Sequence, residues 1–333
     1  MFVNPSKWLL RGLRALAGTA CAALLAAGAQ AASLTVLLAD DDAAHAEFVR
    51  RLRVSQDAGS PFELLRLPAD AAPADRAAPG EDRAGAGVRT RSLRRAPVEA
   101  PVTMAVGVVA SRSAIERPGN DPLVLAMLSR LDYESLKSHP ALRRGDRHVG
   151  ILLREPAMAD QIALIDAVLP RKRRLGVVAT PESEPIVREL QRAAQGWDLQ
   201  VEYAPDAKSL ASVLRLLVAR SDALMVLPDL IGDSQAATLS VLRAGAAAGL
   251  PVFGTSDGLV RSGGLAAAVS TPGQLAQQAR TLGQKLAVAS VADDVLVEAA
   301  TPSTVRVNAT VARGLGLRLP EERELTERVT ASR

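Results

Sequence analysis

The chain has 333 residues, 48% of them hydrophobic and 2% aromatic, a length that suits about two domains. It carries 40 basic and 36 acidic residues, but three of the basic residues and none of the acidic ones lie before residue 32. The remainder holds 37 basic against 36 acidic residues. Net charge therefore gives no argument for binding nucleic acid or an anionic membrane.

The N-terminus has the pattern of a secretory signal peptide. Lys7, Arg11 and Arg14 precede an uncharged stretch rich in Ala and Leu, which ends at the small-residue pattern Ala29-Gln30-Ala31. This predicts a signal peptide over residues 1–31, cleavage after it, and a periplasmic location. The alternative is an uncleaved anchor, because the next charged residue is Asp40.

Cysteine usage agrees with that compartment. Cys21 is the only cysteine and lies within the apolar region. Gly18, three positions before it, does not fit a lipoprotein cleavage site. The cleaved chain would have no cysteine, and so neither a disulfide nor thiol chemistry.

The first part of the cleaved chain predicts strands over residues 34–39 and 62–67, separated by a helix that carries Phe48, Val49 and Leu52 on one face. Residues 68–101 are rich in Ala, Pro, Arg and Gly and have no hydrophobic periodicity. They predict a flexible insertion, with a tether to a partner as the alternative.

The rest of the chain alternates short apolar strands with amphipathic helices. The predicted strands cover residues 103–109, 123–127, 148–153, 175–179, 199–203, 223–227, 251–253 and 265–269. The clearest helices lie over 158–169, behind Thr180-Pro181, over 235–248 and behind Thr271-Pro272. This alternation predicts an α/β fold with parallel sheets and βαβ crossovers.

Polar residues follow several of these strands. In open parallel sheets, small molecules bind outside the carboxyl ends of the strands, where helix N-termini offer free N–H groups. The candidate ligand-binding residues by this rule are Asp40, Asp41, Ser111, Ser113, Thr180, Glu182, Asp229, Ser256 and Asp257. Each of them alone is also explained by helix capping or by a turn.

Patterns for catalysis are weak. His45, His139 and His148 lack the spacing of a metal site, and neither a nucleophile elbow nor a phosphate-binding loop occurs. Asp40-Asp41-Asp42 could hold a metal, but three carboxylates after a strand are more typical of a solvated turn with a helix cap. The sequence thus predicts no enzyme, no metal and no cofactor. The basic run 171–174 and the arginines of 89–95 lack interleaved aromatics, so solvated loop charge is expected there.

Four segments resemble one known family. They are RRLGVVATPESEP (173–185), SDALMVLPDLI (221–231), GLPVFGTSDGLVRSGGLAA (249–267) and VRVNATVARGLGLRLP (305–320). Together they resemble ABC-transporter substrate-binding proteins of the tryptophan/tyrosine-binding type. The resemblance implies a type I periplasmic-binding fold, with two Rossmann-like lobes joined by a hinge of three crossovers. We expect lobe 1 over 32–150 plus 273–333 and lobe 2 over 151–272.

The family's ligand contacts carry over in part. Ser111-Arg112-Ser113 resembles a Ser/Thr-rich turn, Asp229 resembles the Asp of an Asp-Asn pair, and Ser256-Asp257 resembles a Ser-Asp turn. Leu230 replaces the Asn of that pair. Val269, Ser270 and Thr271 stand where the family often has Tyr and Asp, and Arg154-Glu155 where the hinge strand usually ends in an Asp. These departures, with the scarcity of aromatics, disfavour an aromatic amino acid as ligand.

The resemblance implies a monomeric periplasmic solute-binding protein that captures a small polar molecule between its lobes and delivers it to an ABC permease. The alternative is a sensory component on the same fold that signals to a membrane receptor or kinase. A periplasmic enzyme is a third hypothesis, for which the sequence has no recognisable catalytic set.

Overall fold

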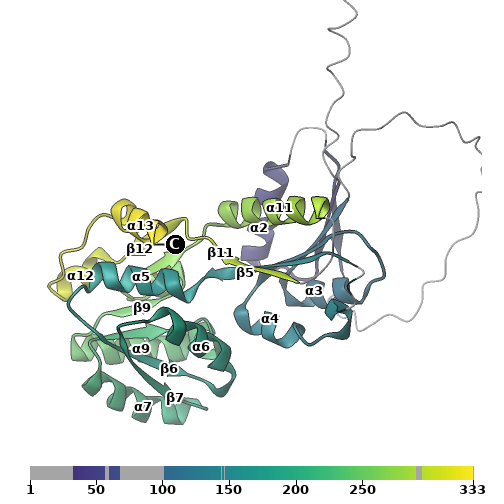
Figure 1. The fold of residues 1–333 in the computed structure, drawn as a ribbon. Helices are drawn as coiled ribbons and strands as arrows, with labels where there is room; N and C mark the ends of the chain where they lie inside the picture. The colour runs from purple at the N-terminus through teal and green to yellow at the C-terminus, as the bar shows by residue number, and fades with distance from the viewer. Residues whose placement is uncertain are drawn as a thin grey trace, which may run out of the picture.

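The computed structural model describes residues 33–56, 60–67, 101–143, 145, 147–289 and 295–332. The predicted signal peptide and all of the predicted insertion except Pro101 lie outside these residues. Within them, no helix is both long enough and apolar enough to span a membrane. The chain forms two lobes, each built on one sheet (Figure 1).

Lobe 1 is a six-stranded sheet in the order β11-β5-β4-β3-β1-β2, in which all neighbouring strands are parallel. Its elements are β1 (Leu34–Leu38), α2 (Ala43–Val54), β2 (Phe62–Arg66), β3 (Val102–Val106), α3 (Gly107–Glu116), β4 (Leu123–Leu128), α4 (Arg130–Leu136), the 3-10 helix η1 (Pro140–Arg143), β5 (Val149–Pro156), α11 (Pro272–Val288) and β11 (Leu296–Ala300).

Lobe 2 has a six-stranded sheet in the order β12-β10-β9-β8-β6-β7, parallel except where β12 runs against β10. Its elements are α5 (Met158–Val168), β6 (Arg174–Ala179), the 3-10 helix η2 (Pro181–Ser183), α6 (Glu184–Ala193), β7 (Asp198–Tyr203), α7 (Ala207–Arg220), β8 (Ala223–Val226), α8 (Leu230–Asp233), α9 (Gln235–Ala248), β9 (Val252–Gly254), α10 (Asp257–Arg261), β10 (Ala266–Val269), β12 (Thr304–Val307), α12 (Ala309–Gly314) and α13 (Glu322–Ala331).

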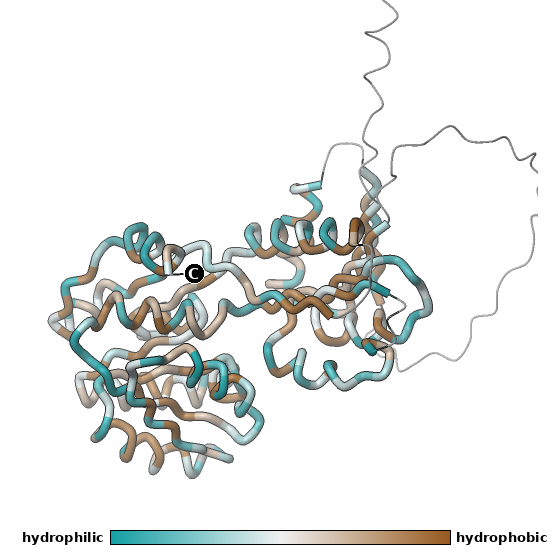
Figure 2. The backbone as a smooth tube through the Cα atoms, viewed as in Figure 1, coloured by the Kyte–Doolittle hydropathy of each residue, from teal (hydrophilic) through white to brown (hydrophobic). Residues whose placement is uncertain are grey.

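Each sheet is covered by helices on both faces, which explains why its strands are continuous apolar runs. In lobe 1, α2 and α11 lie on one face, where Val36 joins their core, and α3 and α4 lie on the other, where Leu37 joins theirs. In lobe 2, α5, α6, α12 and α13 cover one face, and α7 to α10 cover the other. The hydrophobic residues accordingly concentrate in the strands of each lobe (Figure 2). The predicted α/β fold with two mostly parallel sheets is confirmed.

The chain crosses between the lobes three times, after β5, after β10 and after β11. The last crossing differs from the expected lobe boundaries, because residues 304–331 return to lobe 2 instead of remaining with lobe 1. There β12 pairs with β10, and Leu325 and Val329 of α13 are fully buried in the core of lobe 2. Lobe 1 also extends beyond residue 150, because β5 keeps pairing with β11 as far as Pro156.

The strand expected over 103–109 ends early. Gly107 has a φ of 81° and starts α3 directly after β3, so Ser111 and Ser113 lie inside a helix and the expectation of a turn there is wrong. A Cβ on Gly107 would come within 2.7 Å of His45 Cε1. Both the backbone conformation and the close approach of this side chain require glycine at this position.

The basic run 171–174 is exposed, as expected, and in addition Asp222 contacts residues 172–174. Asp222 accepts hydrogen bonds from the backbone N–H and the guanidinium of Arg174, and it pairs with Lys172 at 3.4 Å. Arg173 pairs with Asp166 at 3.6 Å and lies over the Trp197 ring. The Arg174 guanidinium and the backbone N–H groups hold the pKa of Asp222 well below its usual range.

We expect Asp222→Asn to destabilise lobe 2 by about 1–3 kcal/mol at pH 7, because it leaves the N–H groups of residues 173–174 with a weaker acceptor. Since the folded-state pKa is lowered, the stabilisation by Asp222 is present above the unfolded pKa of 3.8 and is lost as pH falls below it. The difference between wild type and variant should therefore shrink towards pH 3.

Urea unfolding followed by Trp197 fluorescence measures this, because Trp197 is the one tryptophan after residue 31 and lies in lobe 2. Glu327→Gln, which removes an exposed helix ion pair with Arg323, is the control and should change stability by less than about 0.5 kcal/mol. Equal effects of the two variants at pH 7 would contradict the role of Asp222.

Candidate ligand-binding cleft

A cleft of about 430 Å³ lies between the lobes beside the crossovers. Its lining comes from α2, β4, β5 and α11 of lobe 1, from β8, α8, α10, β10 and β12 of lobe 2 with the residues that follow β8 and β9, and from the crossing at 270–272. Parallel strands bring their carboxyl ends to one edge of each sheet, and the hinge turns these two edges towards each other. The position is therefore the one that the strand-end rule predicts for a ligand.

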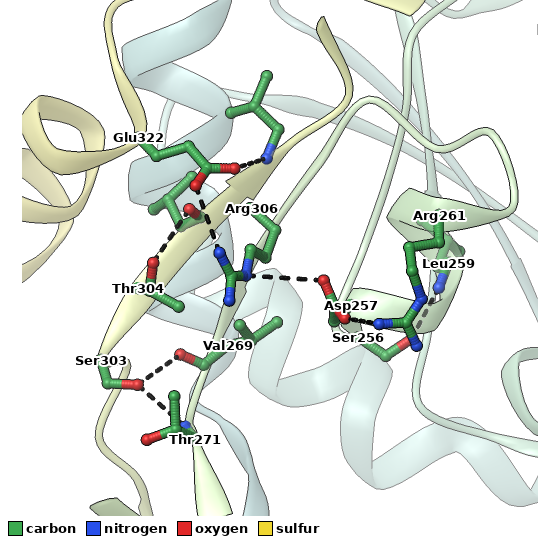
Figure 3. Close-up of polar contacts among 12 residues, drawn as sticks. Ser256, Asp257, Leu259, Arg261, Val269, Thr271, Ser303, Thr304, Arg306 and Glu322 are labelled. Atoms are coloured by element: carbon green, nitrogen blue, oxygen red, sulfur yellow. Dashed lines mark hydrogen bonds and ion pairs between the residues drawn. The ribbon is translucent and has the colours of Figure 1, made fainter.

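Hydrogen bonds hold the second and third crossings together. Ser270 Oγ donates to the carbonyl of Thr301 at 2.5 Å. The N–H of Thr271 donates to Ser303 Oγ at 2.9 Å (Figure 3). The N–H of Thr301 donates to the side chain of Gln278 in α11 at 2.9 Å. These bonds satisfy backbone groups where the chain has left both sheets.

Two charged residues end the hinge strand β5. Arg154 donates from Nε to Glu155 Oε1 at 2.7 Å, and its guanidinium reaches Asp233 of lobe 2 at 3.6 Å. Both line the cleft, and only 9% of the Glu155 surface is exposed. Burial raises the pKa of the Glu155 carboxyl above its usual range, against the opposing effect of the Arg154 guanidinium. Arg154 thus links the hinge strand to the other lobe.

Met127, which also lines the cleft, has a φ of 62°. Among the described residues, it is the one residue other than glycine that has a positive φ. The register between β4 and β5 shifts between Ala126 and Leu128, so Met127 is the extra residue of a bulge. Strained backbone of this kind tends to occur at ligand sites, and here it turns β4 at the edge of the cleft.

Ser256 and Asp257 are the two of the nine sequence candidates that line this cleft. Ser256 caps α10 by accepting from the N–H of Leu259 at 3.2 Å. Asp257 contacts Arg261 in the same helix and Arg306 of β12, the latter at 3.6 Å (Figure 3). Both residues therefore have partners within lobe 2 while they face the cleft.

Thr180 and Asp229 are brought together below the cleft wall through Ser183. Ser183 Oγ lies 2.9 Å from Thr180 Oγ1 and donates to Asp229 Oδ2 at 2.5 Å. Asp229 Oδ1 accepts from the N–H groups of Ile231 and Gly232 and so caps α8. Burial raises the pKa of Asp229, although the hydrogen bond from Ser183 opposes the shift. This carboxyl is fully buried, so it supports the wall of the cleft.

The other candidates are spread over both lobes. Asp40 follows β1 and lies 2.8 Å from Nδ1 of His45, while Asp41 is exposed and pairs with Arg66. Glu182 is exposed in η2. The remaining two lie in α3, where Ser113 is half-buried and Ser111 is fully buried. Ser111 Oγ has no hydrogen-bond partner within the described residues.

Several cleft residues were not candidates from the sequence, among them Met127, Arg154, Glu155, Asp233 and Arg306. One signal was available, because Arg154-Glu155 interrupts an otherwise apolar strand, GILLREP, just before its proline. The others depend on contacts between segments far apart in the chain. No group of three side chains suited to metal binding occurs in the described part of the chain.

A family model described as ABC transporter substrate binding protein matches residues 113–327. The chain belongs to this family. The resemblance predicted from the four segments, all within that range, is thereby confirmed. Proteins of this family bind small molecules, work with ABC permeases and are typically extracytoplasmic, and the family is a non-catalytic class.

Solved structures share the fold of this substrate-binding protein. A ligand-free, open substrate-binding protein with adhesive properties from Clostridium difficile is 14% identical, with a TM-score of 0.61 over 87% of this chain and 96% of that one. An ABC domain from Streptococcus pneumonia in complex with L-Trp is 17% identical, with a TM-score of 0.52 over 87% and 96%. A conserved domain protein from Vibrio cholerae is 18% identical, with a TM-score of 0.54 over 90% and 98%.

At these identities the comparison concerns the fold alone. Among curated proteins, none matches this chain.

Because Asp229 supports the cleft wall, we expect Asp229→Ala to lower the stability of this substrate-binding protein by about 1–3 kcal/mol. The substitution leaves the Ser183 hydroxyl and two N–H groups without their acceptor in a buried place. Asp229→Asn, which keeps one carbonyl oxygen for the cap, should cost less.

The matched control is Asp206→Ala, which removes an exposed cap that accepts from the N–H of Ser209 in α7. Urea unfolding followed by Trp197 fluorescence compares the variants within the same lobe. A cost for Asp229→Ala no greater than for Asp206→Ala would show that the buried network contributes little.

Proposed function

We propose that this protein is a periplasmic solute-binding protein that captures a small polar molecule in its interlobe cleft and delivers it to an ABC permease. One observation carries the proposal. In a chain of this family, a cleft of about 430 Å³ is lined from both lobes and lies beside the three crossings that join them. A change in the angle between the lobes would open or close this cleft, and hinge closure is how two-lobed binding proteins hold a ligand.

The lining supports a polar solute rather than a flat aromatic one. The described residues that line the cleft include Arg154, Glu155, Asp233, Ser270 and Thr271, and none of the described lining residues is aromatic. The Streptococcus structure was solved with L-Trp, but the walls here offer no ring on which an indole could stack. We infer that the ligand is held by hydrogen bonds and charge.

Among the sequence candidates, Ser256 and Asp257 are the ones that we propose to contact the ligand directly. Thr180 and Asp229 would shape the wall, while Asp40, Asp41 and Glu182 lie at strand ends and would approach the ligand as the lobes close. A ligand contact by Ser111 or Ser113 stays a prediction, because both lie in α3 and neither lines the cleft. Residues 1–31 would be removed as the signal peptide during export, which leaves a monomer in the periplasm.

A thermal-shift screen of the protein starting at residue 32 tests ligand capture, with amino acids, amines, sugars, nucleosides and small anions as solutes. A solute at 100 times its Kd should add about 2.7 kcal/mol and raise the Tm by a few degrees. Thr255→Trp is the control, because Thr255 lines the cleft and an indole there should fill it and abolish the shift. A blank screen, or a shift that survives in this variant, would contradict the proposed cleft.

The gene neighbourhood tests delivery to a permease. Genes for an ABC permease and ATPase beside this one would agree with transport. A neighbouring gene for a membrane receptor or kinase, without a permease, would instead support the sensory alternative.

A further inference from the structure

Glu155 has a buried acceptor atom that the protein leaves unpaired. Its Oε1 accepts from Arg154 Nε at 2.7 Å, but Oε2 is buried and has no hydrogen-bond partner among the residues that the structure describes. The side chain as a whole is nine-tenths buried and lines the cleft. A buried carboxylate oxygen without a donor is costly, and native proteins rarely keep one without a use for it.

The cation that contacts Glu155, the guanidinium of Arg154, is already shared with another carboxylate. Arg154 contacts Asp233 at 3.6 Å as well as Glu155, and Asp132 and Asp42 also lie close enough to interact with it electrostatically. Within 4 Å this one guanidinium contacts two carboxylates, those of Glu155 and Asp233, and none of its hydrogen bonds reaches Oε2 of Glu155.

The second arginine of the cleft does not correct this imbalance. Arg306 lies 3.6 Å from Asp257 and 3.4 Å from Glu322, and Asp257 also contacts Arg261 (Figure 3). Apart from Asp233, which contacts Arg154, the charged cleft residues of lobe 2 are thus paired within that lobe. Among the residues that line the cleft, the carboxylates of Glu155, Asp233 and Asp257 outnumber the guanidinium groups of Arg154 and Arg306. Of these carboxylates, that of Glu155 is the buried one.

We propose that the solute carries a protonated nitrogen, as an ammonium, amidinium or guanidinium group, which donates a hydrogen bond to Glu155 Oε2. The inference rests on the proposed function and names the class of its ligand. A cationic donor would supply the missing hydrogen bond and also compensate the excess negative charge, and such charge-assisted bonds are the strong ones. A neutral donor would supply the bond alone, and an anion would be repelled.

The position of Glu155 gives this contact a second consequence. The residue after it, Pro156, is the last of β5, from which the chain passes into α5 of lobe 2. A cation held here would lie at the first crossing, next to the Arg154 guanidinium that contacts lobe 2. The cationic group of the solute, which Glu155 would select, would then also contact the hinge.

Isothermal titration with charge-matched probes tests the inference, using the protein from residue 32. The cationic probes are putrescine, cadaverine and agmatine, and the comparison probes, which have no protonated nitrogen, are 1,4-butanediol, 1,5-pentanediol and glutarate. We expect binding to favour cationic probes, and Glu155→Gln to weaken that binding at least about tenfold. Glu155→Asp, which keeps the charge but shortens the side chain, should weaken binding less.

Glu202→Gln is the matched control, because it changes another glutamate paired with an arginine, Arg220 at 2.6 Å, on the edge strand β7 and away from the cleft. The Kd of the Glu202→Gln variant for the cationic probes should stay within about twofold of the wild-type value. Glu155→Gln takes a charged partner from Arg154 and is expected to lower the Tm. The titrations are therefore run at a temperature at which circular dichroism shows every variant folded, which separates lost affinity from unfolding.

The outcomes separate the two proposals. Neutral or anionic probes that bind as tightly as the cations, or an unchanged Kd for Glu155→Gln, would overturn the cationic ligand and leave solute capture intact. No binding by these probes or by any solute of the thermal-shift screen would overturn both.

Discussion

Three crossings of the chain at one edge of both sheets are the constraint on which the rest of the structure depends. At each crossing the backbone leaves a sheet and must find partners outside the strand ladder. Ser270, Thr271 and Ser303 provide them between the second and third crossings, and Gln278 adds the link to α11. The second and third crossings are thereby joined, and together with the first they set how the strand ends of the two lobes face each other.

The charged residues between the lobes follow from this hinge. Arg154 and Glu155 lie at the end of β5 because that strand continues as far as Pro156 alongside β11. From there Arg154 contacts Asp233 of lobe 2, and elsewhere Arg130 of α4 pairs with Glu189 of α6 at 2.5 Å. These two ion pairs link the lobes, and Leu131 of α4 also packs against the core of lobe 2. Such contacts are compatible with lobes that change their angle, because exposed or half-buried pairs contribute little to stability.

The polar residues at strand ends perform two different tasks. Asp42, Asp229 and Ser256 each accept from the N–H groups of a helix that follows a strand, so capping explains their position. In lobe 2 the cap at Asp229 also joins Thr180 and Ser183 into a closed network beneath the wall of the cleft. Glu155 differs because it caps no helix and keeps a free oxygen. Recurrence of polar residues at strand ends therefore indicates the edge of the cleft, while the unsatisfied oxygen that also lines the cleft marks the contact that we propose.

The sequence by itself determined the alternation of strands and helices, and with it the fold class and the family, because hydrophobic periodicity and cap residues act over a few positions. It also predicted the edge of the sheets at which the cleft lies, through residues such as Ser256 and Asp257. It misjudged the end of the strand before Gly107, because a left-handed glycine packed against His45 is a long-range contact.

Only the tertiary structure decided that residues 304–331 return to lobe 2, because β12 has to pair with β10 and Leu325 has to reach a core that the chain left after β10. For the same reason only the tertiary structure showed the charge balance of the cleft. Arg154, Asp233 and Arg306 meet there from segments far apart in the sequence, and the partners of a buried charge are determined by packing rather than by spacing along the chain.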